Sequence, residues 1–369
     1  MIKRLLIYVL LLASVSAGAI PCQRKAVYVV KTVDGFPSDE KGYELGVSAC
    51  YAGRIGDELI IAGGCNFPEQ GAPKKYYQGI YAAKADTAAL TWRLIGYLPE
   101  PAAYGGVVES GDSLVFVGGN NSEHSLRSVF SLHVVDGKAV IHQMPSLPVT
   151  ADNMAVAGDG KNIYVFGGNQ NGKASGNLLK YNLKNKSGWQ TLAVAPDKPR
   201  VQPVAVAVKN KVYVLGGFYA DGDNSITHTD GYCYNAKKQT WQHIDSPVDA
   251  DGNAITYSGG IATLSNGNGI ICLGGVNKDI FTDAISGRHS LVSEKDYLSK
   301  PVAWYRFNPH AMFYAIARGK WFPLITDKSL ARAGAQIVNL GNIIYYIGGE
   351  LKPGARTPQI VILRRHFIR

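Results

Sequence analysis

The sequence predicts an all-β fold, a six-bladed kelch-type β-propeller. Its 369 residues include 42 glycines and 21 tyrosines, and no long amphipathic helical pattern is present, which favours short strands joined by tight turns. An apolar run that ends in Gly-Gly recurs along the chain, mostly about 50 residues apart, which is the period of kelch-type blades. The runs cover residues 59–64, 114–119, 163–168, 212–217, 270–275 and 343–349.

Each blade is expected to contain four antiparallel strands. The innermost strand precedes the Gly-Gly run and carries small residues, because these strands crowd around the propeller axis; it is expected at 46–52, 103–108, 201–208, 257–262 and 332–338. Aromatic third strands are expected at 79–82, 179–182, 232–235 and 304–307. The fourth strands carry Trp92, Trp189, Trp241 or Trp321, which are expected to pack between neighbouring blades rather than to stack on a ligand.

The two ends of the chain are expected to share one blade. The last blade lacks a fourth strand after residues 359–364, and the strand-like segment 26–31 has no blade of its own. Pairing these segments would close the ring and remove its free edges. Residues 20–369 are therefore expected to form a single propeller domain.

Residues 1–19 are expected to be a signal peptide. Lys3 and Arg4 precede an apolar core at 5–15, and small residues follow at 16–19. The protein is therefore expected to be exported. No later apolar run has the length of a membrane span, so no membrane association is expected after signal cleavage.

The charge and the cysteines exclude several classes of site. The net charge of +10 is spread along the chain, which argues against nucleic-acid binding and favours a small anionic ligand. The five cysteines form no CxxC pair, and the histidines show no metal-binding spacing, so neither a metal nor a cofactor is expected. The cysteines are expected to be buried thiols, with one disulfide among Cys22, Cys50 and Cys65 left open.

Polar residues are expected to converge on one face of the propeller. In a four-stranded blade, the loop after strand two and the segment before strand one lie on the same face. Side chains of the first kind are Asn66, Asn120, Asn169, Asn277 and Glu350, and those of the second kind are Tyr104, Asp152, Asn153, Arg200, Gln202, Ser258 and Arg332. Carboxylate, guanidinium and amide groups suit a polyhydroxylated anion. The polar connection 278–301 is expected on this face as a lid or a rim.

The last repeat differs from the others. Only there is the Gly-Gly pair followed by a glutamate, Glu350, and six residues later by an arginine, Arg356. From the residues alone the pair is either a salt-bridged turn or a catalytic pair.

The chain resembles the sialic acid mutarotases, or N-acetylneuraminate epimerases, which are six-bladed kelch propellers of Gram-negative periplasms. The resemblance rests on Gly349-Glu350-x-Lys352-Pro353-Gly354-x-Arg356-Thr357, on Gly-Gly-Val-Asn-Lys-Asp-Ile-Phe at 274–281, and on Pro199-Arg200-x-Gln202. In better-known members the blade with the first motif lies mid-chain. The order here therefore resembles a cyclically permuted branch, which a ring whose ends meet tolerates.

The resemblance implies a periplasmic enzyme that interconverts the α and β anomers of N-acetylneuraminate by ring opening and closure, without a cofactor. The family's catalytic residues correspond to Glu350, the expected general base, and Arg356, expected to bind the sugar carboxylate or the developing oxyanion. Substrate contacts are expected from Arg200, Gln202, Asn277, Arg332, Asn66 and Tyr104. The alternative is a non-catalytic exported kelch propeller that binds glycans or proteins.

Overall fold

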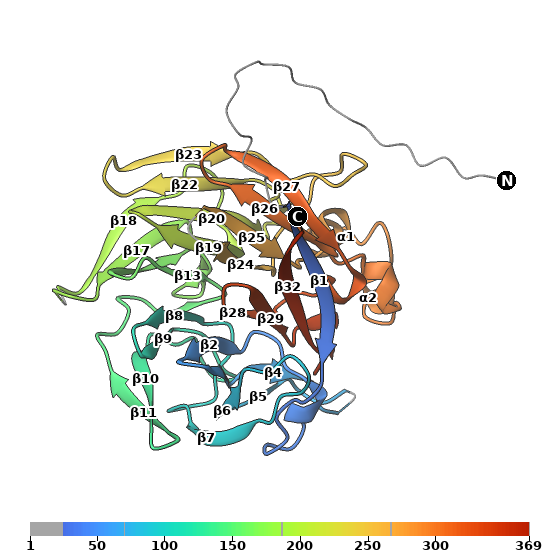
Figure 1. Cartoon of the computed structure of the whole chain (residues 1–369). Helices are drawn as coiled ribbons and strands as arrows, with labels where there is room; N and C mark the ends of the chain where they lie inside the picture. Colours follow the sequence, from blue (N-terminus) through green and yellow to red (C-terminus); the bar gives the residue numbers. More distant parts are fainter. Residues whose placement is uncertain (1–24, 70, 186, 266–267, 369) are drawn as a thin grey trace, which may run out of the picture.

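The fold is all-β, as predicted. The computed structural model describes residues 25–69, 71–185, 187–265 and 268–368, and these residues form six large antiparallel sheets (Figure 1). The expected signal peptide at 1–19 and Cys22 lie outside the described residues. No helix within the described ranges has the length and apolar character needed to cross a membrane.

Five of the sheets are built from strands that follow one another in the chain, each running outward from an innermost strand. They are β2 (Tyr51–Ile55), β3 (Glu58–Ala62), β6 (Gly79–Lys84) and β7 (Arg93–Tyr97); β8 (Gly106–Ser110), β9 (Ser113–Val117), β10 (Val129–Val135) and β11 (Lys138–Gln143); β13 (Ala155–Gly158), β14 (Asn162–Phe166), β17 (Asn177–Asn182) and β18 (Trp189–Val194); β19 (Val201–Val208), β20 (Lys211–Tyr219), β22 (Gly231–Asn235) and β23 (Thr240–Ile244), with β21 (Ile226–Thr227) beside β20; and β24 (Ile261–Ser265), β25 (Gly269–Leu273), β26 (His310–Ala315) and β27 (Lys320–Thr326).

The sixth sheet joins the two ends of the described chain. Its strands are β28 (Gln336–Asn339), β29 (Ile343–Ile347), β32 (Ile360–Ile368) and β1 (Lys25–Val33). Strand β1 pairs antiparallel with β32, with Val29 opposite Arg364, and the two strands run side by side in Figure 1. Residues 26–31 are thus paired as expected, although their partners are residues 362–367 rather than 359–364.

Short strands and helices extend from the sheets. Two-residue and three-residue strands form β4 (Cys65–Asn66) with β5 (Lys75–Tyr76), β12 (Ala151–Asp152) with β15 (Asn169–Gln170) and β16 (Lys173–Ala174), and β30 (Glu350–Lys352) with β31 (Ala355–Arg356). Helical turns are η1 (Tyr43–Leu45), α1 (Lys278–Ile285), α2 (Glu294–Tyr297), η2 (Val302–Tyr305) and η3 (Lys328–Leu330).

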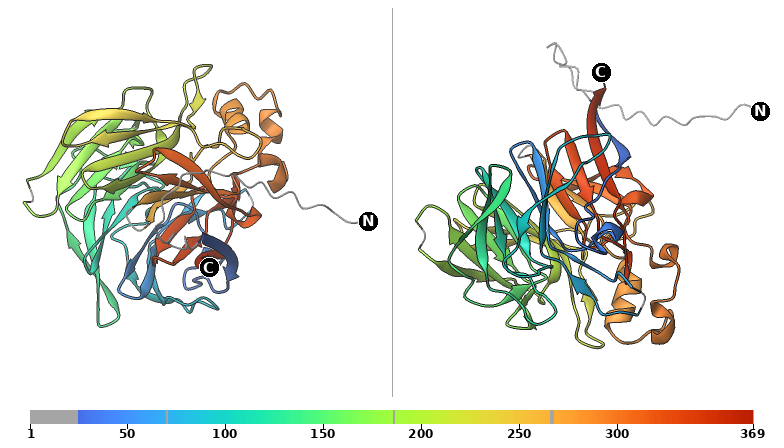
Figure 2. Two further views of the ribbon diagram at one scale, coloured as in Figure 1. Left: turned by 45° about the horizontal axis from the view of Figure 1, so that its top comes forward. Right: turned by 90° about the horizontal axis from the view of Figure 1, so that it is seen from below.

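One local expectation is corrected. The aromatic segment 304–307 is not a strand, because η2 occupies its start; the third strand of that sheet is β26. The error arises from the aromatic composition of an insertion that interrupts the blade pattern. The segment 278–301, expected as a lid or a rim, contains α1 and α2, which project from one side of the sheets (Figure 2).

Separate hydrophobic cores lie between neighbouring sheets. The innermost strands contact one another in the order β2, β8, β13, β19, β24 and β28, and β28 also contacts β2. Between the first and the last sheet, Leu59 and Ile61 pack in one buried cluster with Tyr345 and Ile362. Burial at this seam therefore resembles burial between sheets that are consecutive in the chain.

The Gly-Gly pairs are joints between sheets. In most repeats the N–H of the second glycine donates to a backbone carbonyl at the start of the next sheet, at 2.8 Å: Gly64 to Ala102, Gly119 to Ala151, Gly168 to Arg200, Gly275 to Arg332 and Gly349 to Val47. In the remaining joint the Ser258 hydroxyl donates to the Gly217 carbonyl at 2.6 Å. A Cβ on Gly348 would lie 2.5 Å from the Val47 oxygen, so a side chain there would push the two sheets apart.

A closed cycle of backbone hydrogen bonds links the innermost strands. At each of these strands one residue, two positions before the strand or, for Gln202, inside β19, donates its N–H to the carbonyl of the corresponding residue in the preceding sheet, at 2.7–3.0 Å. The residues are Ala49, Tyr104, Asn153, Gln202, Gly259 and Gly334, and Ala49 in turn donates to Gly334. All have a positive φ, between 51° and 67°. A left-handed conformation costs a non-glycine residue roughly 1 kcal/mol, which the hydrogen bond and the packing must offset.

The tryptophans bridge neighbouring sheets, as expected. Trp92, Trp189 and Trp321 donate their indole N–H to carbonyls that follow the outermost strand of the preceding sheet, those of Gly35, Pro145 and Asp245. Trp241 packs against Phe166 of the preceding sheet, with ring centroids 5.9 Å apart. Their role is therefore structural.

We expect β1 to contribute to stability through its buried side chains. Val33 is 2% exposed in the core between the first and last sheets, whereas Val29 on the same strand is 50% exposed. Val33→Ala should lower the free energy of unfolding by about 1.5–2 kcal/mol for two lost methyl groups, and Val29→Ala by less than about 0.5 kcal/mol. Equal losses in urea unfolding would contradict the assignment of β1 to this core.

Candidate functional site

Glu350 and Arg356 occupy a hairpin at the seam between the first and last sheets. The hairpin consists of β30 and β31, in which Glu350 and Arg356 are cross-strand partners. Backbone hydrogen bonds in both directions join Glu350 to Ala333, the neighbour of Gly334 in the backbone cycle. Because directly opposite residues place their side chains on one face of a hairpin, the carboxylate and the guanidinium are brought together.

The two side chains form a largely buried ion pair. Arg356 Nη1 lies 2.8 Å from Glu350 Oε2, and the side chains are 4% and 23% exposed. Arg356 Nε donates to Ser48 Oγ at 3.0 Å, and the guanidinium lies 5.0 Å from the centre of the Phe67 ring. The contact between Nη1 and Glu350 is an ion pair without an aligned hydrogen bond.

Tyr104 and Lys74 complete the cluster. The Lys74 ammonium donates to the Tyr104 hydroxyl oxygen at 3.2 Å, and the Cys65 thiol lies 3.5 Å from the same oxygen. Since the phenol oxygen accepts from these groups, its own hydrogen is free to be donated elsewhere.

Burial dominates the ionisation of the site. It raises the pKa of Glu350, while the positive charges of Arg356 and Lys74 oppose the rise. Burial also raises the pKa of Tyr104 well above its ordinary value, with further contributions from Cys65 and Glu350. Glu350 is thus a stronger base than an exposed glutamate, and Tyr104 keeps its proton at neutral pH.

Beside this cluster lies a central cavity of about 400 Å³, lined by all residues of the backbone cycle. Gln202 and Asn153 are part of its polar wall: Gln202 Nε2 donates to Asn153 Oδ1 at 2.8 Å, and Asn153 Nδ2 donates to Asp152 Oδ1, outside the lining, at 2.7 Å. Asn169 donates to the same Asp152 oxygen at 2.9 Å. Such a wall offers hydrogen bonds to hydroxyl groups.

Four residues expected to contact substrate have hydrogen-bond partners within the fold. Arg200 and Arg332 are fully buried, and each donates from Nη1 to the carbonyl of the first glycine in its own sheet's Gly-Gly pair, at 3.0 Å. Asn66 donates to the carbonyls of Gly42 and Gly46. Asn277 caps α1 by accepting from the backbone N–H groups of Asp279 and Ile280. Substrate contact by these four stays a prediction, whereas Gln202 and Tyr104 line the central cavity.

Lys74 was not predicted from the sequence, because it lies in an irregular segment between a Gly-Gly pair and a third strand. Lys352 donates to the carbonyls of Leu298 and Lys300, at 3.0 and 2.7 Å, and so fastens the β30–β31 hairpin to the helical insertion. That insertion forms one wall beside Glu350, since Tyr297 and Tyr305 line a small cavity together with it.

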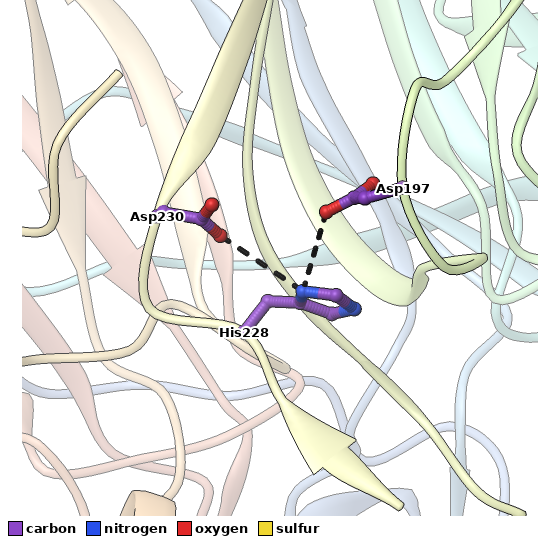
Figure 3. Close-up of side chains that lie close together, drawn as sticks. All are labelled: Asp197, His228 and Asp230. Carbon is purple, nitrogen blue, oxygen red and sulfur yellow. Dashed lines mark ion pairs between the residues drawn. The ribbon is translucent and has the colours of Figure 1, made fainter. Parts of the chain in front are cut away.

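A second cluster of ionisable groups lies outside the cavity. Figure 3 shows His228 Nδ1 facing Asp197 and Asp230, at 3.7 and 3.9 Å. These three side chains have metal-like spacing, but Arg200 Nη2 already donates to both carboxylates, at 2.6 and 2.9 Å. The guanidinium supplies the positive charge that a metal ion would bring, so we assign the cluster a structural role.

The thiols of Cys50 and Cys65, both within the described residues, are free and buried.

The family model described as N-acetylneuraminate epimerase matches residues 144–365, a stretch that includes Glu350 and Arg356. N-acetylneuraminate epimerase 1 of Escherichia coli O6:H1 is 31% identical over 212 residues, covering 53% of this chain and 55% of that protein. N-acetylneuraminate epimerase of Yersinia enterocolitica is 33% identical over 193 residues, covering 48% of this chain and 47% of that protein. The chain thus spans about half the length of the curated relatives it matches.

The solved structure of YjhT is similar in fold. It superposes with a TM-score of 0.52 at 24% sequence identity, covering 61% of this chain and 67% of that chain.

We expect His228 to make stability depend on pH. Burial and the Arg200 charge lower its pKa from 6.5 to about 4. Between these values the unfolded chain binds more protons, so stability should fall as the pH decreases from 6.5 to 4, by at most about 1.4 kcal/mol per pH unit. His228→Gln should flatten this part of the curve of unfolding free energy against pH, and His366→Gln, at an exposed position, should not. An unchanged curve for His228→Gln would show that other groups carry the dependence.

Proposed function

The chain belongs to the N-acetylneuraminate epimerase family, and we propose that it is a mutarotase that interconverts the α and β anomers of N-acetylneuraminate. The observation that carries the proposal is the buried Glu350–Arg356 ion pair, in which a carboxylate of raised pKa sits beside a guanidinium. Proton transfer at one hydroxyl and stabilisation of one developing oxyanion are the two tasks of this reaction.

The reaction proceeds by ring opening. Glu350 takes the proton of the anomeric hydroxyl, the bond between the anomeric carbon and the ring oxygen breaks, and the ketone forms. The Tyr104 hydroxyl, whose hydrogen is not used by Lys74 or Cys65, gives a proton to the departing ring oxygen. Rotation presents the other face of the ketone, and the proton transfers reverse as the ring closes. No net change in charge or oxidation state occurs, so the chain's own acid and base groups are sufficient.

We assign Arg356 to the anomeric oxygen rather than to the sugar carboxylate. Its charge is already balanced by Glu350 at 2.8 Å, so it has little left to attract a second carboxylate. Its Nη1 group lies beside the base, where the oxyanion develops as the proton leaves.

We also propose that the six sheets are the blades of one closed propeller. The cycle of hydrogen bonds and the shared core of the first and last sheets support closure. The family match from residue 144 to 365 leaves the first two sheets outside, which is what a permuted blade order would produce in a collinear alignment. Export to the periplasm is part of the same proposal, motivated by the signal-like residues 1–19.

The test is anomer exchange followed by NMR on freshly released α-N-acetylneuraminate, with and without the protein. Faster approach to equilibrium is expected with the protein. Binding without any acceleration would instead indicate a non-catalytic glycan-binding propeller.

Glu350→Gln should abolish most of this acceleration, since glutamine keeps the shape of the side chain but cannot take the proton. We expect exchange to fall by roughly 10²–10⁴-fold, with affinity changed little. Stability should fall by about 1–3 kcal/mol, because a buried guanidinium loses its counter-charge. Glu109→Gln is the matched control, since Glu109 is another arginine-paired carboxylate that lines the central cavity. Full activity in folded Glu350→Gln protein would remove Glu350 as the base.

Arg356→Lys should lower the exchange rate by roughly 10²-fold, the loss typical of one oxyanion donor. Lysine keeps the charge but cannot contact Glu350 and Ser48 from one planar group. Its effect on affinity should be similar for N-acetylneuraminate and for its uncharged methyl ester. A selective loss of affinity for the acid would show that Arg356 binds the sugar carboxylate.

A further inference from the structure

Lys74 is a cation without a carboxylate partner at the edge of the site. Its ammonium lies 5.0 Å from the centre of the Tyr104 ring and 5.9 Å from those of Phe67 and Tyr76. Its hydrogen bond goes to a neutral group, the Tyr104 hydroxyl. Within the described residues, no carboxylate lies at ion-pair distance from it.

The other positively charged side chains near the site already have partners. Arg356 is paired with Glu350, Arg332 is fully buried against backbone carbonyls, and Lys352 holds two carbonyls of the insertion. The carboxylate of Glu100 lines a neighbouring cavity with Lys74, but Asn121 donates to it at 2.8 Å and His124 lies 3.1 Å from it. Lys74 therefore remains available to a charged ligand.

The cluster carries an excess positive charge. Glu350 and Arg356 cancel, and Lys74 adds one charge in a half-buried position walled by aromatic rings. Because attraction between charges strengthens where water is excluded, an anion is the ligand that best complements this arrangement.

The position of Lys74 also fits the chemistry of a 2-keto sugar acid. In such a sugar the carboxylate and the anomeric hydroxyl are attached to the same carbon atom. A ligand that places its hydroxyl at Glu350 must therefore hold its carboxylate close by. Glu350 pairs with Arg356, and Arg356 and Lys74 lie over the same Phe67 ring, at 5.0 and 5.9 Å from its centre.

We propose that Lys74 binds the substrate carboxylate and thereby selects acidic over neutral sugars. The inference rests on the proposed function for the identity of the sugar, but it concerns binding rather than catalysis. Lys74 is a specificity residue in this scheme, and Glu350 and Arg356 act on the neighbouring oxygen.

The test compares affinities for N-acetylneuraminate and for its methyl ester, which lacks only the charge. Lys74→Met should weaken binding of the acid by roughly 10- to 100-fold, the value of a hydrogen bond to a charged group, and leave the ester nearly unchanged. Lys74→Arg should restore most of the preference. Binding of the acid to the wild type should weaken with added salt, and less so for Lys74→Met.

Lys75→Met is the matched control. The Lys75 side chain has other partners than Lys74, since its ammonium donates to the Lys41 carbonyl and lies over the Tyr77 ring. This variant should bind both sugars as the wild type does. Thermal melting of each variant checks that it is folded.

Equal losses for acid and ester in folded Lys74→Met protein, or equal losses in the Lys74 and Lys75 variants, would overturn the inference. Wild-type protein that binds the acid through Lys74 but does not accelerate anomer exchange would uphold the inference and refute the mutarotase. Wild-type protein that binds neither sugar would refute both.

Discussion

The backbone joint between neighbouring sheets is the constraint on which the rest of this structure depends. At the seam between the last and first sheets, Gly349 donates to Val47 at 2.8 Å, and Ala49 donates to Gly334 at 2.7 Å. These bonds leave no space for a side chain at Gly348. Glu350 follows directly after one joint residue and Ser48 follows the other. The joint therefore sets the position of the base and of the hydroxyl that holds Arg356.

The same joints explain how far the sequence could predict the fold. A Gly-Gly pair after an apolar strand is required wherever one sheet approaches the next, so the repeat predicted the number of large sheets correctly. The first residues of the innermost strands were predicted less well. The residues just before β2, β8, β24 and β28 belong to the backbone cycle with positive φ rather than to strands. The insertion with α1 was missed, since eight helical residues among aromatic and polar neighbours give too short a pattern.

The candidate site likewise contains residues that the sequence indicated and residues that it did not. Glu350 and Arg356 stood out because they break the repeat, and the structure pairs them. Arg200 and Arg332 occupy equivalent places in two repeats, where a buried guanidinium holds the turn of the Gly-Gly pair. The sequence did not indicate this structural contact, because the carbonyls that accept from the two arginines are brought close only by folding. Lys74 belongs to no repeated element, so only the folded chain could place its ammonium beside Tyr104.

The candidate site takes its residues from both sides of the seam between the last and the first sheet. Glu350 and Arg356 come from the last sheet, whereas Ser48, Phe67 and Lys74 come from the first. The chain runs from β1 of the last sheet into β2 of the first sheet, and hydrogen bonds and a shared core also hold these two sheets together. The two ends of the described chain meet inside the last sheet, where β1 pairs with β32, so no contact of the site depends on a peptide connection between these two strands. A change in blade order would thus preserve the surroundings of Glu350, which is how a permuted member of the family could keep the chemistry of the others.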